Sequence, residues 1–569
     1  MAEPIIITDF ETGIADSPHK GIGLLRNVNI DAFTGAVKAN PALASIFNTA
    51  VSATVTAADT DICTSTGMTG NANTTGQAVK FTTTGTLPAG LTANTVYFVL
   101  TVSQAAGTFK VTTTIAGGTT VNITDTGSGT HTVATVNPGA INHIVQDSNT
   151  SVRFFQDSNG RVWYLASGAV LMKLLVNAVL DNAVVGSASL ANSTGNGIVT
   201  FLVSDSSATY LFAFRNALID VINVFAVTNQ ETPVWSNAWQ TMNTAGSTSN
   251  RHHAIVAQDN IIYYTDGRFI GSIKEISGQV FAPGSSSTYT WTSQALDTSL
   301  NEVLVHLEEL NVNLLAAGST FNKIYPWDRV SDSYNLPLVV PENNVYRIKN
   351  LGNLVYILAG GVGNIYTTQG TYVRFFKKIP EHLTNNSGTI TSNPISWGGI
   401  DIVNGALIFG MSVQTSGNSG VYKLYPDGRL VIDQIPTTAG NATALQVTDN
   451  LYYVGFANGA NLTNTVRYSS FEGIMQSQFY RVATKTAKAQ FSTLEVVIAQ
   501  PASSGNVRIK YRVDTSSAFG NFPNGATSFA ADSSTTTFSA DIGLMNLENI
   551  QVQAEIDGVM ELVEIRLLP

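Results

Sequence analysis

The stretches LGNLVYILA (351–359) and VNGALIFGM (403–411) each consist of a short turn followed by an apolar and aromatic strand. Similar units recur along the chain, and their turns are anchored at Gly160, Ala208, Asn260, Asn311, Asn353, Asn404 and Asn450. Successive anchors lie 42 to 52 residues apart. A unit of about 45 residues is the size of one four-stranded propeller blade. The repeat therefore predicts an all-β chain with a β-propeller of about seven blades over residues 139–470.

The composition agrees with strands and turns but leaves a second explanation of the repeat open. Of the 569 residues, 44% are apolar and 12% are charged, about half of the usual ~25% charged residues. Any strand-rich chain of this composition yields some turn-then-strand matches at loosely even spacing. The single cysteine, Cys63, excludes an intramolecular disulfide and any cysteine-based zinc or iron–sulfur site.

Two segments depart from the repeat. Residues 51–138 are rich in Thr and alternate apolar with polar side chains, as in Val96-Tyr97-Phe98-Val99, which predicts an inserted small β-sandwich. Residues 471–569 contain longer alternating strands, which predict a C-terminal β-sandwich. We expect residues 1–50 to lead into the propeller, with the insert interrupting the first blade.

Motifs for catalysis and cofactor binding are missing from the sequence. Gly360-Gly361-Val362-Gly363 is rich in glycine, but no Lys-Ser/Thr pair follows it, as a P-loop requires. The only histidine cluster is His252-His253, and neighbouring strand residues point to opposite faces. Cys63 has no base nearby in sequence. We therefore predict that the chain is not an enzyme and has no catalytic, cofactor-binding or metal-binding residues.

A glycosidase is the strongest enzymatic alternative to this prediction. The segment 157–163 (DSNGRVW) faintly resembles the Asp-box turn of sialidase-type propellers, and a glycosidase needs two carboxylates facing a sugar cleft. The carboxylates available for such a pair are Glu308, Glu309, Asp401 and Asp433. Adjacent Glu308 and Glu309 would point to opposite faces of one strand.

The sequence contains no complete calcium-binding loop. Asp157-x-Asn159 and Asp147-x-Asn149 supply only fragments of a calcium loop. Asp and Asn that cap turns explain both fragments better.

Two stretches of the sequence resemble phage tail proteins. GIGLLRNVNIDAFTGAVKANPALASI (21–46) is similar to the entry segment of β-propeller tail proteins, the tail nozzle or tail hub class of short-tailed bacteriophages. The insert around GTLPAGLTANTVYFV is similar to a β-sandwich module found in phage tail and fibre proteins. The C-terminal sandwich departs from this pattern, because it would also suit a receptor-binding or baseplate protein.

The resemblance implies a structural virion protein located in the tail. Its copies would form a homo-oligomeric ring, hexameric in that family, which contacts the adaptor and the tail fibres, closes the tail and guides DNA at genome ejection. The net charge of −10 argues against a general nucleic-acid binder, so we expect viral DNA to pass through without specific binding.

Two other functions stay open. The alternative is a tail-tip or fibre protein that binds host surface glycan, with the aromatic turns Tyr325-Pro326-Trp327 and Trp397-Gly398-Gly399 stacking on sugars. The third is a glycan hydrolase. The most apolar stretch, residues 168–186, is interrupted by polar residues, so we expect no membrane insertion.

Overall fold

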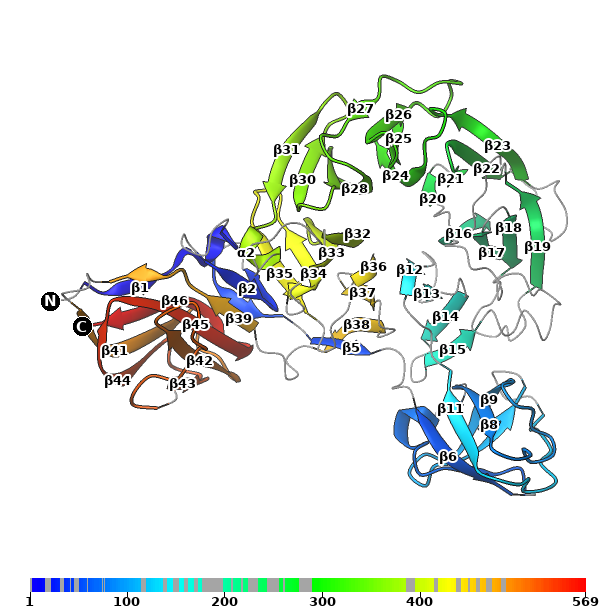
Figure 1. The fold of residues 1–569 in the computed structure, drawn as a ribbon, viewed down its shortest axis with the longest axis horizontal. Coiled ribbons are helices and arrows are strands. Elements are labelled where there is room, and N and C mark those ends of the chain that lie inside the picture. The colour runs from blue at the N-terminus through cyan, green and yellow to red at the C-terminus, as the bar shows by residue number, and fades with distance from the viewer. Residues whose placement is uncertain are drawn as a thin grey trace. The chain divides into compact units, whose positions relative to one another are not determined.

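A computed structural model shows that the chain is built almost entirely of β-strands (Figure 1). It describes residues 3–15, 22–30, 35–40, 42–45, 51–58, 60–73, 75, 77–113, 119–136, 141–146, 153–157, 162–167, 172–176, 198–205, 208–215, 218–223, 234–242, 255–258, 261–275, 289–384, 395–413, 418–435, 442–448, 451–456, 461–466, 473–482, 488–525 and 527–569. Within these ranges the helical elements are short: η1 (Asp9–Thr12), η2 (Gly70–Asn73) and α2 (Glu381–Thr384).

Seven four-strand units follow one another along the chain. The first four blades are β12 (Ile141–Gln146), β13 (Arg153–Asp157), β14 (Val162–Ser167) and β15 (Met172–Val176); β16 (Ile198–Asp205), β17 (Ala208–Arg215), β18 (Leu218–Asn223) and β19 (Val234–Thr241); β20 (Ile255–Gln258), β21 (Ile261–Asp266), β22 (Phe269–Glu275) and β23 (Tyr289–Asp297); β24 (Leu304–Leu310), β25 (Asn313–Gly318), β26 (Lys323–Trp327) and β27 (Leu338–Val339). The last three are β28 (Val345–Leu351), β29 (Leu354–Ala359), β30 (Asn364–Thr368) and β31 (Val373–Lys378); β32 (Ser396–Val403), β33 (Ala406–Ser412), β34 (Gly420–Leu424) and β35 (Leu430–Gln434); β36 (Ala442–Thr448), β37 (Leu451–Phe456), β38 (Asn461–Val466) and β5 (Ala42–Ser45).

This strand order is that of a seven-bladed β-propeller, as the repeat predicts. The fourth strand of the last blade, β5, comes from the chain ahead of the first blade, so the two ends of the propeller sequence meet in one sheet. Main-chain hydrogen bonds between β5 and β38 therefore link the beginning and the end of the propeller sequence, while each blade keeps its own short edge strands.

The anchors of the repeat fall on one kind of turn. Asn311, Asn353 and Asn404 lie in the turns between the first and second strands of their blades. Asn311 and Asn404 have positive φ values of 55° and 47°, which Asn tolerates better than most residues. Ala208 begins the second strand of its blade. The anchors Gly160, Asn260 and Asn450 lie outside the described residues.

The chain divides into two compact units. One comprises Met1–Ala44, Lys349–Tyr453 and Leu462–Pro569, and the other comprises Ser45–Ile348 and Val454–Asn461. The first four blades and the insert belong to the second unit. The C-terminal strands and most of the last three blades belong to the first.

The insert forms a closed barrel, so the prediction of a β-sandwich is wrong for residues 51–138. Its strands are β6 (Ser52–Ala57), β7 (Cys63–Thr64), β8 (Ala78–Thr83), β9 (Val96–Ser103), β10 (Thr108–Thr112) and β11 (His131–Thr135), in the closed order β10-β7-β6-β11-β8-β9. The short β7 pairs with both β6 and β10 and so closes the sheet around one buried core. The alternating pattern is the same for a barrel and a sandwich, because both bury one face of each strand.

The C-terminal strands form a two-sheet sandwich, as predicted. Its strands are β39 (Gly473–Gln476), β40 (Tyr480–Arg481), β41 (Ala489–Ile498), β42 (Gly505–Arg512), β43 (Thr527–Ala530), β44 (Thr537–Leu547), β45 (Asn549–Gly558) and β46 (Glu561–Leu568). One sheet contains β41, β44 and β46, and the other contains β39, β42, β43 and β45. Ile550, Val552 and Ile556 on β45 and Ile565 and Leu567 on β46 are fully buried.

We expected residues 1–50 to lead into the propeller. Most strands of this segment pair instead with strands of the C-terminal sandwich. β1 (Ile5–Ile7) and β4 (Val37–Ala39) pair with β46, β3 (Val28–Ile30) pairs with β4, and β2 (Leu24–Arg26) pairs with β39. Two strands of the segment join blades: β5 completes the last blade, and β2 pairs with the outer strand β35 of the sixth. The insert therefore lies between β5 and β12, ahead of the first blade and not within it.

Candidate functional site

The most distinctive site is the junction at which the N-terminal segment connects the sixth blade to the C-terminal sandwich. β2 pairs in parallel with the outer blade strand β35 and antiparallel with β39, so that blade and sandwich share one ten-stranded sheet. The amide of Asn27 donates to the carbonyl oxygen of Ile432 at 2.9 Å, and the amide of Gly23 donates to that of Gln476 at 2.9 Å. Leu25, between these bonds, is fully buried.

Two asparagine side chains fix the register of this junction. The Oδ1 atom of Asn27 accepts a hydrogen bond from the amide of Ile435 at 2.8 Å. The Nδ2 atom of Asn40 donates to the carbonyl oxygen of Asp433 at 2.8 Å, to Oδ1 of the same residue at 3.0 Å, and to the carbonyl oxygen of Val28 at 3.0 Å. Asn27 is buried and has a positive φ of 54°. These amides satisfy polar groups that the joined sheet would otherwise bury without partners.

A third asparagine binds the neighbouring strand of the same blade. The Oδ1 atom of Asn29 accepts hydrogen bonds from the hydroxyl of Tyr425 at 2.6 Å and from Nζ of Lys423 at 3.2 Å. On β2, burial lowers the pKa of Arg26. Sequence reasoning missed all three asparagines as site residues, although Asn27, Asn29 and Asn40 all lie in the segment that resembles phage tail proteins. The sequence feature that could have identified them is the position of these polar side chains between apolar ones.

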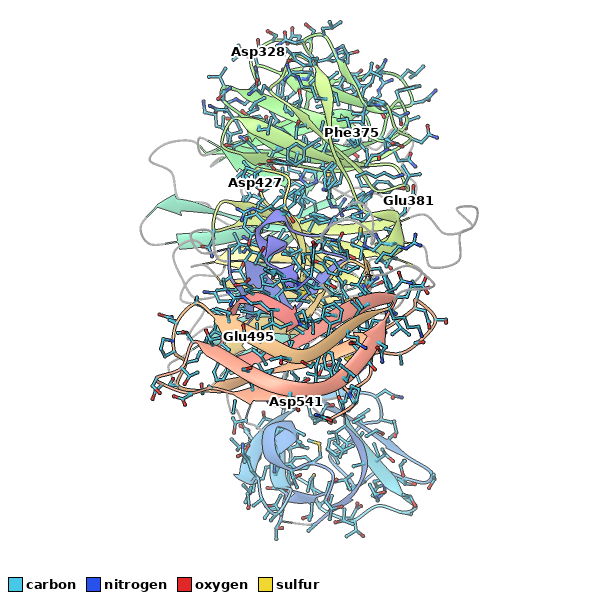
Figure 2. All side chains as sticks on the ribbon, turned by 90° about the vertical axis from the view of Figure 1, so that its left-hand side faces the viewer. Asp328, Phe375, Glu381, Asp427, Glu495 and Asp541 are labelled. Carbon is cyan, nitrogen blue, oxygen red and sulfur yellow. The ribbon has the colours of Figure 1, made fainter. Side chains whose placement is uncertain are left out.

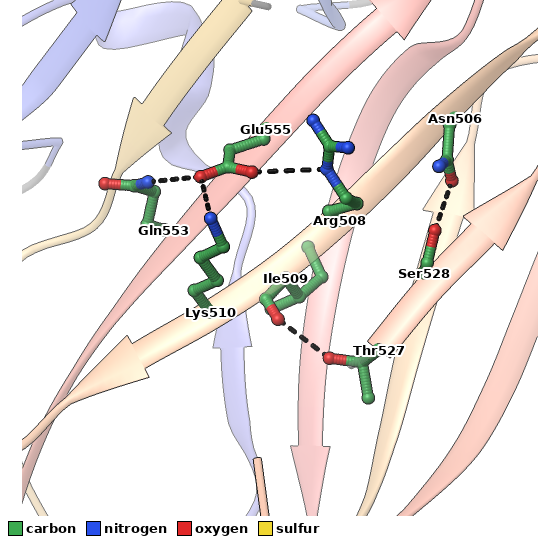
Figure 3. Close-up of polar contacts among 8 residues, drawn as sticks. All are labelled: Asn506, Arg508, Ile509, Lys510, Thr527, Ser528, Gln553 and Glu555. Carbon is green, nitrogen blue, oxygen red and sulfur yellow. Dashed lines mark hydrogen bonds and ion pairs between the residues drawn. The ribbon is translucent and has the colours of Figure 1, made fainter. Parts of the chain in front are cut away.

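The second polar cluster lies on the sandwich strand β45 (Figure 3). The carboxylate of Glu555 is almost fully buried and accepts hydrogen bonds from Lys510 Nζ at 2.6 Å, Gln553 Nε2 at 2.9 Å and Arg508 Nε at 3.2 Å. Burial by itself favours the neutral acid. The bonds and charges of Lys510, Gln553 and Arg508 together outweigh burial and lower the pKa of Glu555. This cluster joins β42 to β45 and stabilises the sheet that β2 extends.

The carboxylates considered for a sugar cleft are tied to neighbouring strands. Asp401 accepts hydrogen bonds from the amides of Ile402 and Val447 and forms an ion pair with Lys349 at 3.4 Å. Asp433 is buried, and its carboxylate accepts a hydrogen bond from Nδ2 of Asn40. Glu308 and Glu309 are half-buried on β24. Asp401 and Asp433 thus serve as hydrogen-bond acceptors within the sheets.

The aromatic turns considered for glycan stacking belong to the blade cores. Tyr325 and Trp327 are buried, and the hydroxyl of Tyr325 donates to Oε2 of Glu302 at 2.6 Å. Trp397 is 6% exposed, and its Nε1 donates to the carbonyl oxygen of Gly360 at 2.8 Å. A Cβ atom on Gly398 would lie 1.7 Å from the carbonyl oxygen of Ala442, so this glycine permits the close approach of β32 and β36.

Of the remaining candidates, the structure describes only the side chain of Cys63. His252, His253, Asp147, Asn149 and Asn159 lie outside the described residues, as does the side chain of Asp157 at the end of β13. Cys63 is fully buried, and burial, with a smaller effect of Asp61, raises the pKa of its thiol to about 12.

The described part of the chain contains neither a metal-binding cluster nor a membrane-spanning helix. Within it, no group of three or more His, Cys, Asp or Glu side chains is arranged to hold a metal ion. None of its helices has the length and hydropathy needed to cross a membrane.

Comparison with known proteins gives similarity of structure only. No protein-family model and no curated protein matches the chain. Virginiamycin B lyase from Staphylococcus aureus matches with a TM-score of 0.40 and 10% identity, over 58% of this chain and 97% of that one. BamB from Moraxella catarrhalis matches with a TM-score of 0.35 and 12% identity, over 74% and 99%. Similarity at this level carries no conclusion about activity or partners.

Proposed function

We propose that the chain is a structural subunit of a bacteriophage tail, of the tail nozzle or tail hub class of short-tailed phages. In this proposal its copies assemble into a homo-oligomeric ring, six-fold as the resemblance implies. The ring contacts the adaptor and tail fibres, closes the tail and conducts viral DNA without binding it specifically.

The observation that supports the proposal most is the junction. Residues 21–46, which resemble the tail proteins, are also the residues that join blade and sandwich into one sheet through Asn27, Asn29 and Asn40. A sheet continuous across two domains resists separation, because its main-chain hydrogen bonds must break before the domains can part. Such rigidity suits a subunit that stays in place while DNA passes.

The state of the candidate reactive groups also favours a structural role over the alternatives. Asp401 and Asp433 hold strands together, and Tyr325 and Trp397 fill blade cores. A sugar-binding or sugar-cleaving site would need such side chains exposed in a cleft.

Assembly mass and ligand binding test this proposal together. We expect analytical ultracentrifugation of the full chain to show a closed assembly of about six copies, with no cleavage of capsular or lipopolysaccharide glycan. We also expect duplex DNA to bind weakly at physiological salt, because a basic lining would replace counterions at every phosphate and hold the DNA. A stable trimer, glycan turnover or tight DNA binding with a steep salt dependence would each contradict it.

A further inference from the structure

The outer strand of the fifth blade, β31, leaves one edge open within the described residues. It pairs with β30 on one side, and no described strand pairs with it on the other. In the sixth blade the outer strand β35 is fully buried, and β2 lies along its outer edge. Outer blade edges of this chain therefore accept an added strand, and β31 offers the same backbone groups to another molecule.

Two aromatic rings at this edge are exposed to solvent. Phe375 is 60% exposed and Tyr372 is 49% exposed. The ring of Phe375 packs edge-on against Tyr366, with centroids 6.0 Å apart, which holds it in place on the surface. Phe375 is labelled in Figure 2, above Glu381. Exposed rings held in a fixed position are typical of binding surfaces.

The same strand concentrates positive charge in an acidic chain. Arg374, Lys377 and Lys378 fall within six residues, whereas the whole chain has a net charge of −10. The guanidinium carbon of Arg374 lies 4.3 Å from the ring centroid of Tyr372, and Lys378 forms an ion pair with Glu381. The edge therefore presents cations beside aromatic rings.

Protection of the edge explains only part of this arrangement. Lysines and a bulge, here between the pairs Ile365–Lys377 and Tyr366–Phe375, are devices that prevent edge strands from pairing with copies of themselves. Protection does not require Tyr372 and Phe375 to be exposed. The charge also selects a partner. The cations of this edge repel a second copy of the same basic edge and attract an acidic strand.

We propose that the edge of β31, with Tyr372, Arg374 and Phe375, docks an extended acidic segment of a partner protein as an added strand. Main-chain groups of the partner would pair with the open edge, its carboxylates would face Arg374 and Lys377, and an apolar side chain would cover Phe375. This docking surface involves other residues than the junction, so its test does not depend on the phage-tail proposal.

The test uses the full chain and a labelled peptide of alternating valine and glutamate, followed by fluorescence anisotropy. We expect the peptide to bind and its affinity to fall as the salt concentration rises. Binding should also slow amide exchange in residues 372–378. A lysine-for-glutamate version of the peptide serves as the matched control and should not bind. In the doubly substituted variant Arg374→Glu with Lys377→Glu, two attractions become repulsions, so we expect affinity to fall about tenfold or more.

Two further variants separate docking from unfolding. Phe375→Thr keeps a strand-forming residue at an exposed position and should weaken binding several-fold with the fold intact. Lys274→Glu reverses a single charge at an exposed lysine on β22 and should leave binding unchanged. The proposal is overturned by absent binding, by equal binding of the lysine peptide, or by unchanged exchange at β31. Tighter binding of a single-stranded DNA oligonucleotide would assign the edge to nucleic acid and would also overturn it.

Discussion

Replacing Asn40 with alanine should loosen the junction between the sixth blade and the sandwich. The side chain donates to two oxygens of Asp433 and to the carbonyl oxygen of Val28, all within 3.0 Å. Its two amide hydrogens make at least two hydrogen bonds with these three acceptors. A net loss of about 1 kcal/mol per bond, with a further cost for leaving buried oxygens without a donor, gives about 2–3 kcal/mol.

Amide hydrogen exchange measures this loss where it occurs. A local destabilisation of about 2–3 kcal/mol corresponds to exchange that is roughly 30 to 150 times faster, since each tenfold change is about 1.4 kcal/mol. We expect this acceleration in peptides covering residues 22–30 and 430–435, which contain the amides of Asn27 and Ile435. Peptides covering β11 of the insert should exchange as before. The control variant Asn343→Ala, at an exposed position, should change neither.

A second substitution at the same position tests the cause. Asn40→Asp places a carboxylate against that of Asp433, so repulsion should make the loss larger at neutral pH than below about pH 4, where the introduced carboxyl takes up a proton. Exchange that accelerates less than threefold in Asn40→Ala, or the same loss at both pH values in Asn40→Asp, would refute the reasoning.

Four further outcomes are expected. Replacing residues 51–138 with a short Gly/Ser linker should leave the rest folded, and the excised module should melt independently, because its ends meet where the amide of Val51 donates to Oγ1 of Thr135 at 2.8 Å; loss of soluble protein would count against this. Tyr325→Phe should lower the free energy of unfolding by about 1 kcal/mol, measured by denaturant titration, because it removes one donor from a buried carboxylate. The lowered pKa of Glu555 stabilises the fold above its unfolded pKa of about 4.3, and this stabilisation is lost as the pH falls through the folded pKa; Lys510→Met should move the loss to higher pH in pH-dependent melting. Cys63, whose thiol pKa is raised to about 12, should resist iodoacetamide at pH 8 in the folded chain and react once denaturant is added.

The blades were visible in the sequence because each is built from local hairpins. The turn at Pro426-Asp427-Gly428, for example, joins β34 to β35, with Gly428 at a φ of 91°, and Asp427 is labelled in Figure 2. Turn residues and alternation carry that information within about ten positions. The inserted module was visible because its composition, rich in Thr, differs from that of the blades.

Long-range strand pairing was not visible. Ile6 pairs with Arg566 and Arg26 pairs with Ile432, so the partners lie hundreds of residues apart and no local pattern identifies them. The closure of the barrel depended on β7, a two-residue strand too short to show alternation. The junction asparagines were hidden because an asparagine in a turn and one that joins two sheets look alike in sequence.

Electron microscopy of the assembled full chain tests the central proposal most directly. We predict class averages with closed rotational symmetry, six-fold as the resemblance implies. A reconstruction should show unbroken strand density from the sixth blade through residues 24–26 into the C-terminal sandwich. Monomers or trimeric fibres at every concentration examined, or a sandwich detached from the blade in the assembled ring, would contradict the account.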